Sequence, residues 1–172
     1  RLCTVVDGSN SEIGIHPTLK DIQREKLSSI VNIFKKKYRV RNIHGIRVHE
    51  LDFNANELYK TIEKSNNIFY DQSMMFPDLP GYRTSFSFPH KFYLKNENRA
   101  SKIVSIPIFV MDTCLNKYMK LNEQNSENYI ENIIEKNIKN SGITSLLIHN
   151  NFFFSRTKHR LNLLKKWIDK IL

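Results

Sequence analysis

Short apolar runs alternate with segments of helical period along the whole chain, and this alternation constrains the fold more than any other feature. Residues 12–16 read EIGIH, a strand pattern, and residues 19–38 place their apolar side chains at helical spacing. Further strand patterns occupy residues 42–51, 67–74, 103–115 and 143–154, and further helical patterns occupy residues 55–65, 126–142 and 156–172. Strands separated by helices imply βαβ units, so the sequence predicts an α/β fold with a largely parallel sheet and right-handed crossovers.

Local signals predict where several of these elements begin and end. Asn54 and Ser126 are the expected N-caps of the helices that follow them, and Gly142 is the expected stop of the second helix. Residues 76–98 are rich in Pro, Gly, Ser and aromatic side chains and predict a long ordered loop. Long loops in compact domains commonly serve a functional site.

Composition excludes some classes of protein. The chain has 172 residues and a formal net charge of +10. No apolar run approaches the roughly 20 residues of a membrane-spanning helix. Its two densest basic runs, FKKKYRVR and SRTKHRLNLLKKW, overlap expected amphipathic helices, where Lys and Arg commonly occupy the solvated face. No nucleic-acid-binding signature accompanies the charge, so no nucleic-acid partner is expected. Cys3 and Cys114 are too few for a disulfide framework and are expected to be ordinary thiols.

Polar residues at the ends of the predicted strands are the candidate functional residues. In folds built from parallel strands, the chemistry gathers at the carboxyl ends of the strands. The residues at these positions are His16, Arg47, His49, Asp71, Asp112 and His149.

Two of these residues are histidines that directly follow apolar strands. His16 comes after EIGI and before Pro17, and a neutral imidazole there suits a zinc ion. His149 ends the run SLLIH and is placed to act as a general acid. The alternatives are a polar residue where a strand stops, for His16, and a histidine bonded to a loop carbonyl, for His149.

Arg47 and His49 lie two residues apart and therefore share a face if the strand persists. An arginine can hold a catalytic carboxylate through two parallel hydrogen bonds. A surface salt bridge of Arg47 is an equally good explanation.

These stretches, in this order, resemble the polysaccharide deacetylases, metal-dependent carbohydrate esterases that include chitin and peptidoglycan deacetylases. SEIGIHPTLKD resembles the second motif of that family, in which a histidine binds the metal. GIRVHELDFNANELYKTIEKSNNIFYDQSM resembles the segment with the third-motif arginine and a YDSS-like strand end. GYRTSFSFPHKFYL and IPIFVMDTCL are similar to the loop and strand of a divergent bacterial subgroup, and LLIHNN resembles the fifth motif with its catalytic histidine.

The resemblance implies one domain over residues 1–172, a distorted (β/α) barrel. It implies removal of N-acetyl groups from the amino sugars of a polysaccharide or oligosaccharide, with a divalent metal, zinc by preference, polarising the carbonyl and activating water. By the same analogy His16 binds the metal and Arg47 orients the catalytic carboxylate, while His149 protonates the departing amine. The analogy assigns the substrate side to Tyr70, Asp71 and Arg83.

Two departures from the family pattern qualify this expectation. The second metal histidine of the family corresponds to Lys20, a poor ligand, and His49 is the expected substitute. The first motif, which carries the aspartate pair, should precede the His16 strand by a strand and a helix, yet Asp7 is too close to His16 for both. The expectation is therefore a partial domain that lacks its first βα unit and is inactive by itself.

Two other functions stay open at this point. A non-catalytic carbohydrate-binding relative of the deacetylase fold would keep the barrel and lack the aspartate pair, and Lys20 favours it. A basic module that binds an acidic polymer is the other, and its binding would fall steeply with salt.

Overall fold

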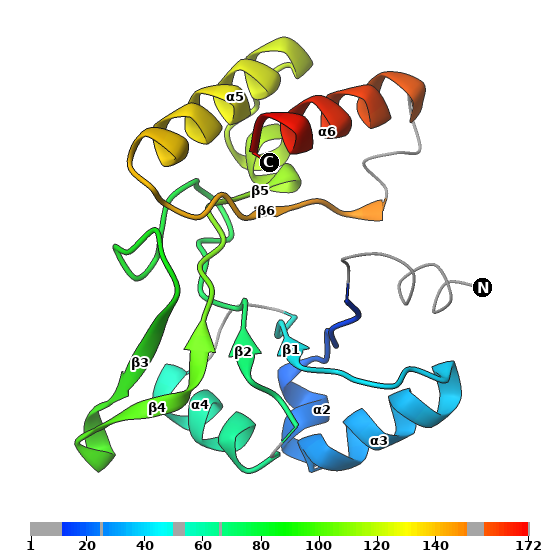
Figure 1. Ribbon diagram of the computed structural model, residues 1–172, viewed down its shortest axis with the longest axis vertical. Coiled ribbons are helices and arrows are strands. Elements are labelled where there is room, and N and C mark those ends of the chain that lie inside the picture. The colour runs from blue at the N-terminus through cyan, green and yellow to red at the C-terminus, as the bar shows by residue number, and fades with distance from the viewer. Residues whose placement is uncertain (1–11, 25, 50–53, 66, 151–156, 172) are drawn as a thin grey trace. The chain divides into compact units, whose positions relative to one another are not determined.

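The computed structural model describes residues 12–24, 26–49, 54–65, 67–150 and 157–171, which form two compact units (Figure 1). The first unit comprises Arg1–Ser73 and His90–Ile106, and the second comprises Met74–Pro89 and Pro107–Leu172. None of the helices in these ranges is long and apolar enough to cross a membrane.

The first unit is a four-stranded sheet with helices. Its sheet has the order β1-β2-β4-β3; β1 pairs in parallel with β2 and β2 with β4, while β3 pairs antiparallel with β4. Ahead of β1, Ile15 and Thr18 form parallel bridges to Ile46 and His49, so this segment extends the parallel order by one more neighbour. Its elements are α2 (Leu19–Arg24), α3 (Leu27–Tyr38), β1 (Gly45–Ile46), α4 (Ala55–Glu63), β2 (Tyr70–Asp71), β3 (His90–Leu94), the 3-10 turn η1 (Lys95–Glu97) and β4 (Arg99–Ser105).

The second unit pairs two parallel strands under helices. Its elements are β5 (Val110–Met111), the π-helical turn η2 (Cys114–Tyr118), α5 (Glu123–Lys139), β6 (Leu146–Leu147) and α6 (Thr157–Ile171). β5 and β6 pair in parallel, and the core around them contains Trp167, Leu115 and Ile134. Cys114 is a buried free thiol in this core, as expected.

Strands and helices alternate as predicted except at the β3–β4 hairpin, and the β1–β2, β2–β4 and β5–β6 pairs are parallel. Asn54 caps α4 as predicted, because its side chain accepts hydrogen bonds from the backbone N–H groups of Asn56 and Glu57. The sheet of the first unit has one antiparallel edge strand, β3, inside the range predicted as a loop. The hairpin closes through η1 and Asn98, which adopts the left-handed conformation (φ 50°) that asparagine tolerates.

The helix predicted over residues 19–38 is two helices. Lys26 has an extended backbone (φ −64°, ψ 131°) and separates α2 from α3. Ile22 and Leu27 are both buried, although five residues span about 140° around a continuous helix. The break lets both side chains face the core.

Two other boundaries differ from the sequence prediction. The strand predicted over residues 103–115 is divided between β4 and β5, because Pro107 between them has no N–H to continue a ladder. The N-cap of α5 is Asn122, whose side chain accepts a hydrogen bond from Asn125 N at 2.8 Å. Ser126 lies inside the helix, with its N–H bonded to the carbonyl of Asn122.

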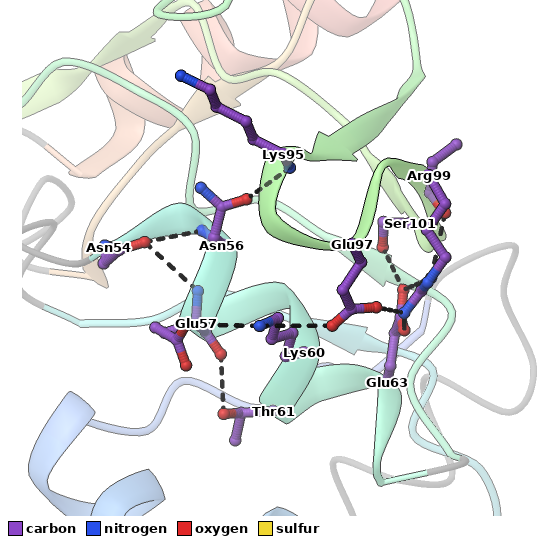
Figure 2. Close-up of polar contacts among 11 residues, drawn as sticks. Asn54, Asn56, Glu57, Lys60, Thr61, Glu63, Lys95, Glu97, Arg99 and Ser101 are labelled. Carbon is purple, nitrogen blue, oxygen red and sulfur yellow. Dashed lines mark hydrogen bonds and ion pairs between the residues drawn. The ribbon is translucent and has the colours of Figure 1, made fainter.

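A polar cluster fixes α4 to the β3–β4 hairpin (Figure 2). The carboxylate of Glu63 accepts hydrogen bonds from Arg99 Nη2 at 2.8 Å and Arg99 Nη1 at 3.2 Å. It also accepts from Ser101 Oγ at 2.9 Å and Lys102 N at 2.8 Å. Arg99 pairs in addition with Glu97. These bonds hold the pKa of Glu63 down at about 2, chiefly through Arg99.

Candidate functional site

The carboxyl ends of two neighbouring parallel segments bring His16, Arg47 and His49 together. Arg47 N donates to Ile15 O at 3.0 Å, and His49 N donates to Pro17 O at 2.8 Å. The rings of His16 and His49 consequently lie edge to face, with centroids 5.0 Å apart. The structure thus places the two predicted metal-binding histidines side by side.

The ring of His16 is held by a backbone carbonyl. His16 Nδ1 lies 2.6 Å from Arg47 O. A carbonyl oxygen only accepts, so Nδ1 carries the proton in this contact. This is the arrangement by which metal-binding histidines are usually oriented.

The imidazole groups of His16 and His49 are chemically suitable zinc ligands, but they are only part of a complete ligand set. Two imidazole nitrogens are suitable zinc donors, and a catalytic zinc commonly has three protein ligands. Among the residues that the structure describes, no group of three or more His, Cys, Asp or Glu side chains is placed to hold a metal ion. Lys20, which the resemblance set in place of a second metal-binding histidine, lies exposed on α2.

Arg47 presents a donor that its described surroundings leave unused. Its Nε is buried and has no hydrogen-bond partner in the described parts of the chain. Burial also lowers the pKa of its guanidinium. A buried, unpaired donor is costly, so an acceptor at this position would be stabilising.

A cavity of about 460 Å³ lies beside His16. This volume is within the range of roughly 300–1,000 Å³ found for small-molecule sites. Its wall is mostly apolar, with a few polar side chains of the first unit. The residues that line it are Ile15, His16, Pro17, Asp21, Ile30, Ile33, Phe34, Lys37 and Tyr38.

Asp71, at the end of β2, is completely buried at 0% exposure. Its carboxylate accepts hydrogen bonds from Tyr59 Oη at 3.0 Å, from Ser73 N at 3.1 Å and from Ser73 Oγ. Burial raises the pKa of Asp71 to about 6, against the effect of these bonds. The sequence analysis assigned Asp71 to the substrate side; among the described residues, its buried carboxylate is bonded to Tyr59 and Ser73.

Tyr70, the neighbour of Asp71 on β2, lies across Gly45 of β1. A Cβ atom on Gly45 would come within 2.3 Å of the Tyr70 ring. The glycine therefore makes room for this ring, which is partly exposed. Tyr70 keeps the access to solvent that a substrate contact requires.

Arg83 lies exposed in the loop of the second unit. Backbone and side-chain bonds hold this loop: Gly81 N donates to Phe109 O at 2.8 Å, and Tyr82 Oη donates to Ile143 O at 2.8 Å. The sequence prediction of an ordered loop is confirmed for residues 76–89.

The second unit contains a carboxylate–histidine pair at the ends of its two parallel strands. Asp112 directly follows β5, and His149 follows β6 by two residues. Asp112 Oδ1 lies 2.6 Å from His149 Nδ1, and Asp112 Oδ2 accepts from His149 N at 2.9 Å. The Asp112 side chain is 7% exposed, whereas that of His149 is 39% exposed. A buried carboxylate therefore orients a ring that solvent and ligands can reach.

The contact between Asp112 and His149 was not predicted from the sequence. Asp112 was recognisable as a polar residue at a strand end, but the pairing of β5 with β6 is what sets it beside His149. His149 is bonded to this carboxylate, whereas the loop-carbonyl alternative would have required a backbone acceptor.

No protein-family model, no curated protein and no solved structure matches this chain. The functional argument therefore stands on the residues and their geometry.

Proposed function

We propose that the protein is a metal-dependent hydrolase of the polysaccharide deacetylase type that removes N-acetyl groups from glycan amino sugars. The observation that carries the proposal is the Asp112–His149 pair: a buried carboxylate bonded to Nδ1 of a partly exposed histidine. This arrangement suits a general acid or base, because the carboxylate fixes the tautomer and stabilises the protonated ring. The barrel architecture remains part of the same proposal.

Amide hydrolysis needs a proton for the departing nitrogen. Water adds to the acetyl carbon, the C–N bond breaks, and the amine leaves only once its nitrogen is protonated. In our proposal His149 Nε2 supplies that proton, and Asp112 holds the ring through Nδ1. General acid catalysis of this kind contributes about 10²–10⁴-fold to a rate.

The residues of the first unit have separate roles. His16 and His49 would hold the divalent metal, zinc by preference. When bound, such an ion polarises the carbonyl and lowers the pKa of a coordinated water. Arg47 Nε is buried and has no hydrogen-bond partner among the described residues, and it would orient the catalytic carboxylate of the family's first motif. Tyr70 and Arg83 would contact the glycan.

The test is acetate release from oligomers of N-acetylglucosamine by the polypeptide that carries this sequence, with a chelator and with zinc restored. We expect the chelator to abolish release and zinc to restore it. His149→Ala should lower the rate by about 10²–10⁴-fold. His44→Ala is the matched control, since this ring packs against Phe69 and belongs to neither site.

Absence of release by the folded polypeptide, on a broad panel of acetylated glycans, would contradict the enzymatic proposal. Binding of the same oligomers without release would support the carbohydrate-binding relative instead. The exposed Lys20, where the family has a ligand, is the observation that favours this second function.

A further inference from the structure

One peptide group links the His16 ring to the interior of the first unit. The carbonyl of Arg47 accepts from His16 Nδ1 at 2.6 Å. The N–H of the same peptide group, that of Val48, donates to Ser73 Oγ at 2.8 Å. A single peptide plane thus carries a hydrogen bond at each end.

The chain of hydrogen bonds continues to a buried carboxylate. Ser73 Oγ donates to Asp71 Oδ1, and Ser73 N donates to the same oxygen at 3.1 Å. Tyr59 Oη donates to Asp71 Oδ2 at 3.0 Å, which fixes the carboxylate from the other side. Asp71 and Ser73 are both 0% exposed, so no solvent competes for these bonds.

We infer that Asp71 is a positioning residue for His16, acting through Ser73 and the peptide group between Arg47 and Val48. The donors all point the same way along the chain: from His16 Nδ1 to the carbonyl, from Val48 N to Ser73, and from Ser73 to Asp71. Hydrogen bonds arranged in this way polarise one another, most of all where the local dielectric is low. The carboxylate therefore makes the Arg47 carbonyl a stronger acceptor and holds His16 in the Nδ1–H tautomer.

The pairing of the strands in the sheet does not require these hydrogen bonds between His16 and Asp71. Gln72 N donates to Ile46 O at 2.9 Å, a regular bond of the β1–β2 ladder. One step further, Val48 N turns to a serine side chain in place of a backbone carbonyl. A buried carboxylate is also costly, and burial raises the pKa of Asp71 to about 6. A positioning role for His16 explains why this position carries an acid.

The hydrogen bonds from His16 to Asp71 are observed in the structure, whereas their effect on zinc binding rests on the proposed function. In that function the hydrogen bond at Nδ1 would orient the ring so that Nε2 is the nitrogen that binds the metal. The two parts can be tested separately.

The tautomer is measured by long-range proton–nitrogen correlation on the full chain labelled with ¹⁵N-histidine, at a pH where the ring is neutral. We expect His16 to show the Nδ1–H tautomer in the wild type. In Ser73→Ala and in Asp71→Asn its two nitrogen signals should move toward tautomer-averaged values. Asp71→Asn keeps an acceptor for the serine hydroxyl, removes the charge, and puts an amide NH2 in place of the oxygen that accepts from Tyr59.

The matched control is Ser101→Ala. Ser101 is also a buried serine of this sheet, but its hydroxyl donates to Glu63. This variant should leave the His16 signals unchanged. A wild-type His16 in the Nε2–H tautomer would overturn the inference, whatever the folding of the variants. Wild-type signals in both Ser73→Ala and Asp71→Asn would overturn it as well.

Zinc affinity, measured by titration with zinc alone, tests the second part. We expect Ser73→Ala to weaken zinc binding by about 10–100-fold relative to Ser101→Ala, the usual effect of removing an outer partner of a ligand. If the wild type binds no zinc but shows the Nδ1–H tautomer, the proposed function fails and the positioning role of Asp71 stands. Equal zinc affinity in Ser73→Ala and Ser101→Ala would show that the hydrogen bonds from His16 to Asp71 do not contribute to zinc binding.

Discussion

Asp112 accepts two hydrogen bonds from His149, one from its ring Nδ1 at 2.6 Å and one from its backbone N at 2.9 Å. The two bonds use different carboxylate oxygens, and Thr113 N donates to Oδ1 as well, at 2.7 Å. The carboxylate is therefore fixed by the backbone at both strand ends, and the ring orientation follows from it.

Asp112→Asn should lower the rate of acetate release by about 10²–10⁴-fold without unfolding the protein. The amide can still accept one hydrogen bond, but it does not stabilise a protonated imidazole. The rate is measured at saturating glycan, with thermal unfolding as the check on the fold. A rate equal to that of the wild type would exclude a catalytic role for the pair.

Glu63→Gln should destabilise the first unit at neutral pH by about 1–3 kcal/mol, because it removes the charged partner of Arg99. The pKa of Glu63 is about 2 in the folded chain and about 4.5 without these partners. A lowered pKa stabilises the fold above the unfolded value, and the contribution is lost as the pH falls from about 4.5 to 2. Urea unfolding at a series of pH values should show the two proteins converging over this range.

Glu57→Gln is the control for that experiment. Glu57 is an exposed residue of α4 whose carboxylate lies 3.7 Å from Lys60. Exposed pairs of this kind contribute about 0–1 kcal/mol. A loss as large as that of Glu63→Gln would show that helix charge, and not the Arg99 contact, accounts for the effect.

The contribution of Asp71 to the stability of the fold should depend on pH in the opposite sense to that of Glu63. The folded pKa of Asp71, about 6, lies above the ordinary value of 3.8, so the fold favours the protonated acid. The stability that this provides is complete below about 3.8 and is lost as the pH rises through about 6. Relative to Asp71→Asn, the wild type should therefore lose stability between these values, measured by urea unfolding. A constant difference between the two proteins would show that Asp71 titrates normally.

Asn122→Ala should destabilise the second unit by about 1 kcal/mol, the usual effect of losing an N-cap. Asn122→Ser keeps a capping oxygen and should retain most of the stability. Ser126→Ala, at the N-cap that the sequence predicted, should have a smaller effect, because Ser126 lies within α5. Chemical unfolding of the three variants decides between the two caps.

Local patterns were enough to identify many elements. The apolar spacing and the capping residue predicted α4 from Asn54 onward, since a cap acts within one turn of its own helix. Local patterns did not predict the elements whose conformation depends on contacts with residues far away in the sequence. β3 has a polar, aromatic sequence that reads as loop and becomes a strand through its pairing with β4. The break at Lys26 likewise follows from the need to bury both Ile22 and Leu27.

The candidate site shows the same division. The sequence by itself determined which polar side chains end the strands, because a strand end is a local signal: His16, Arg47, His49, Asp112 and His149 were all recognisable. Only the tertiary structure decided which of them meet, because the parallel bridge of Thr18 with His49 and the pairing of β5 with β6 join residues far apart in the chain. Hydrogen bonds across one peptide plane then connect His16 to Asp71, and no spacing in the sequence encodes such a path.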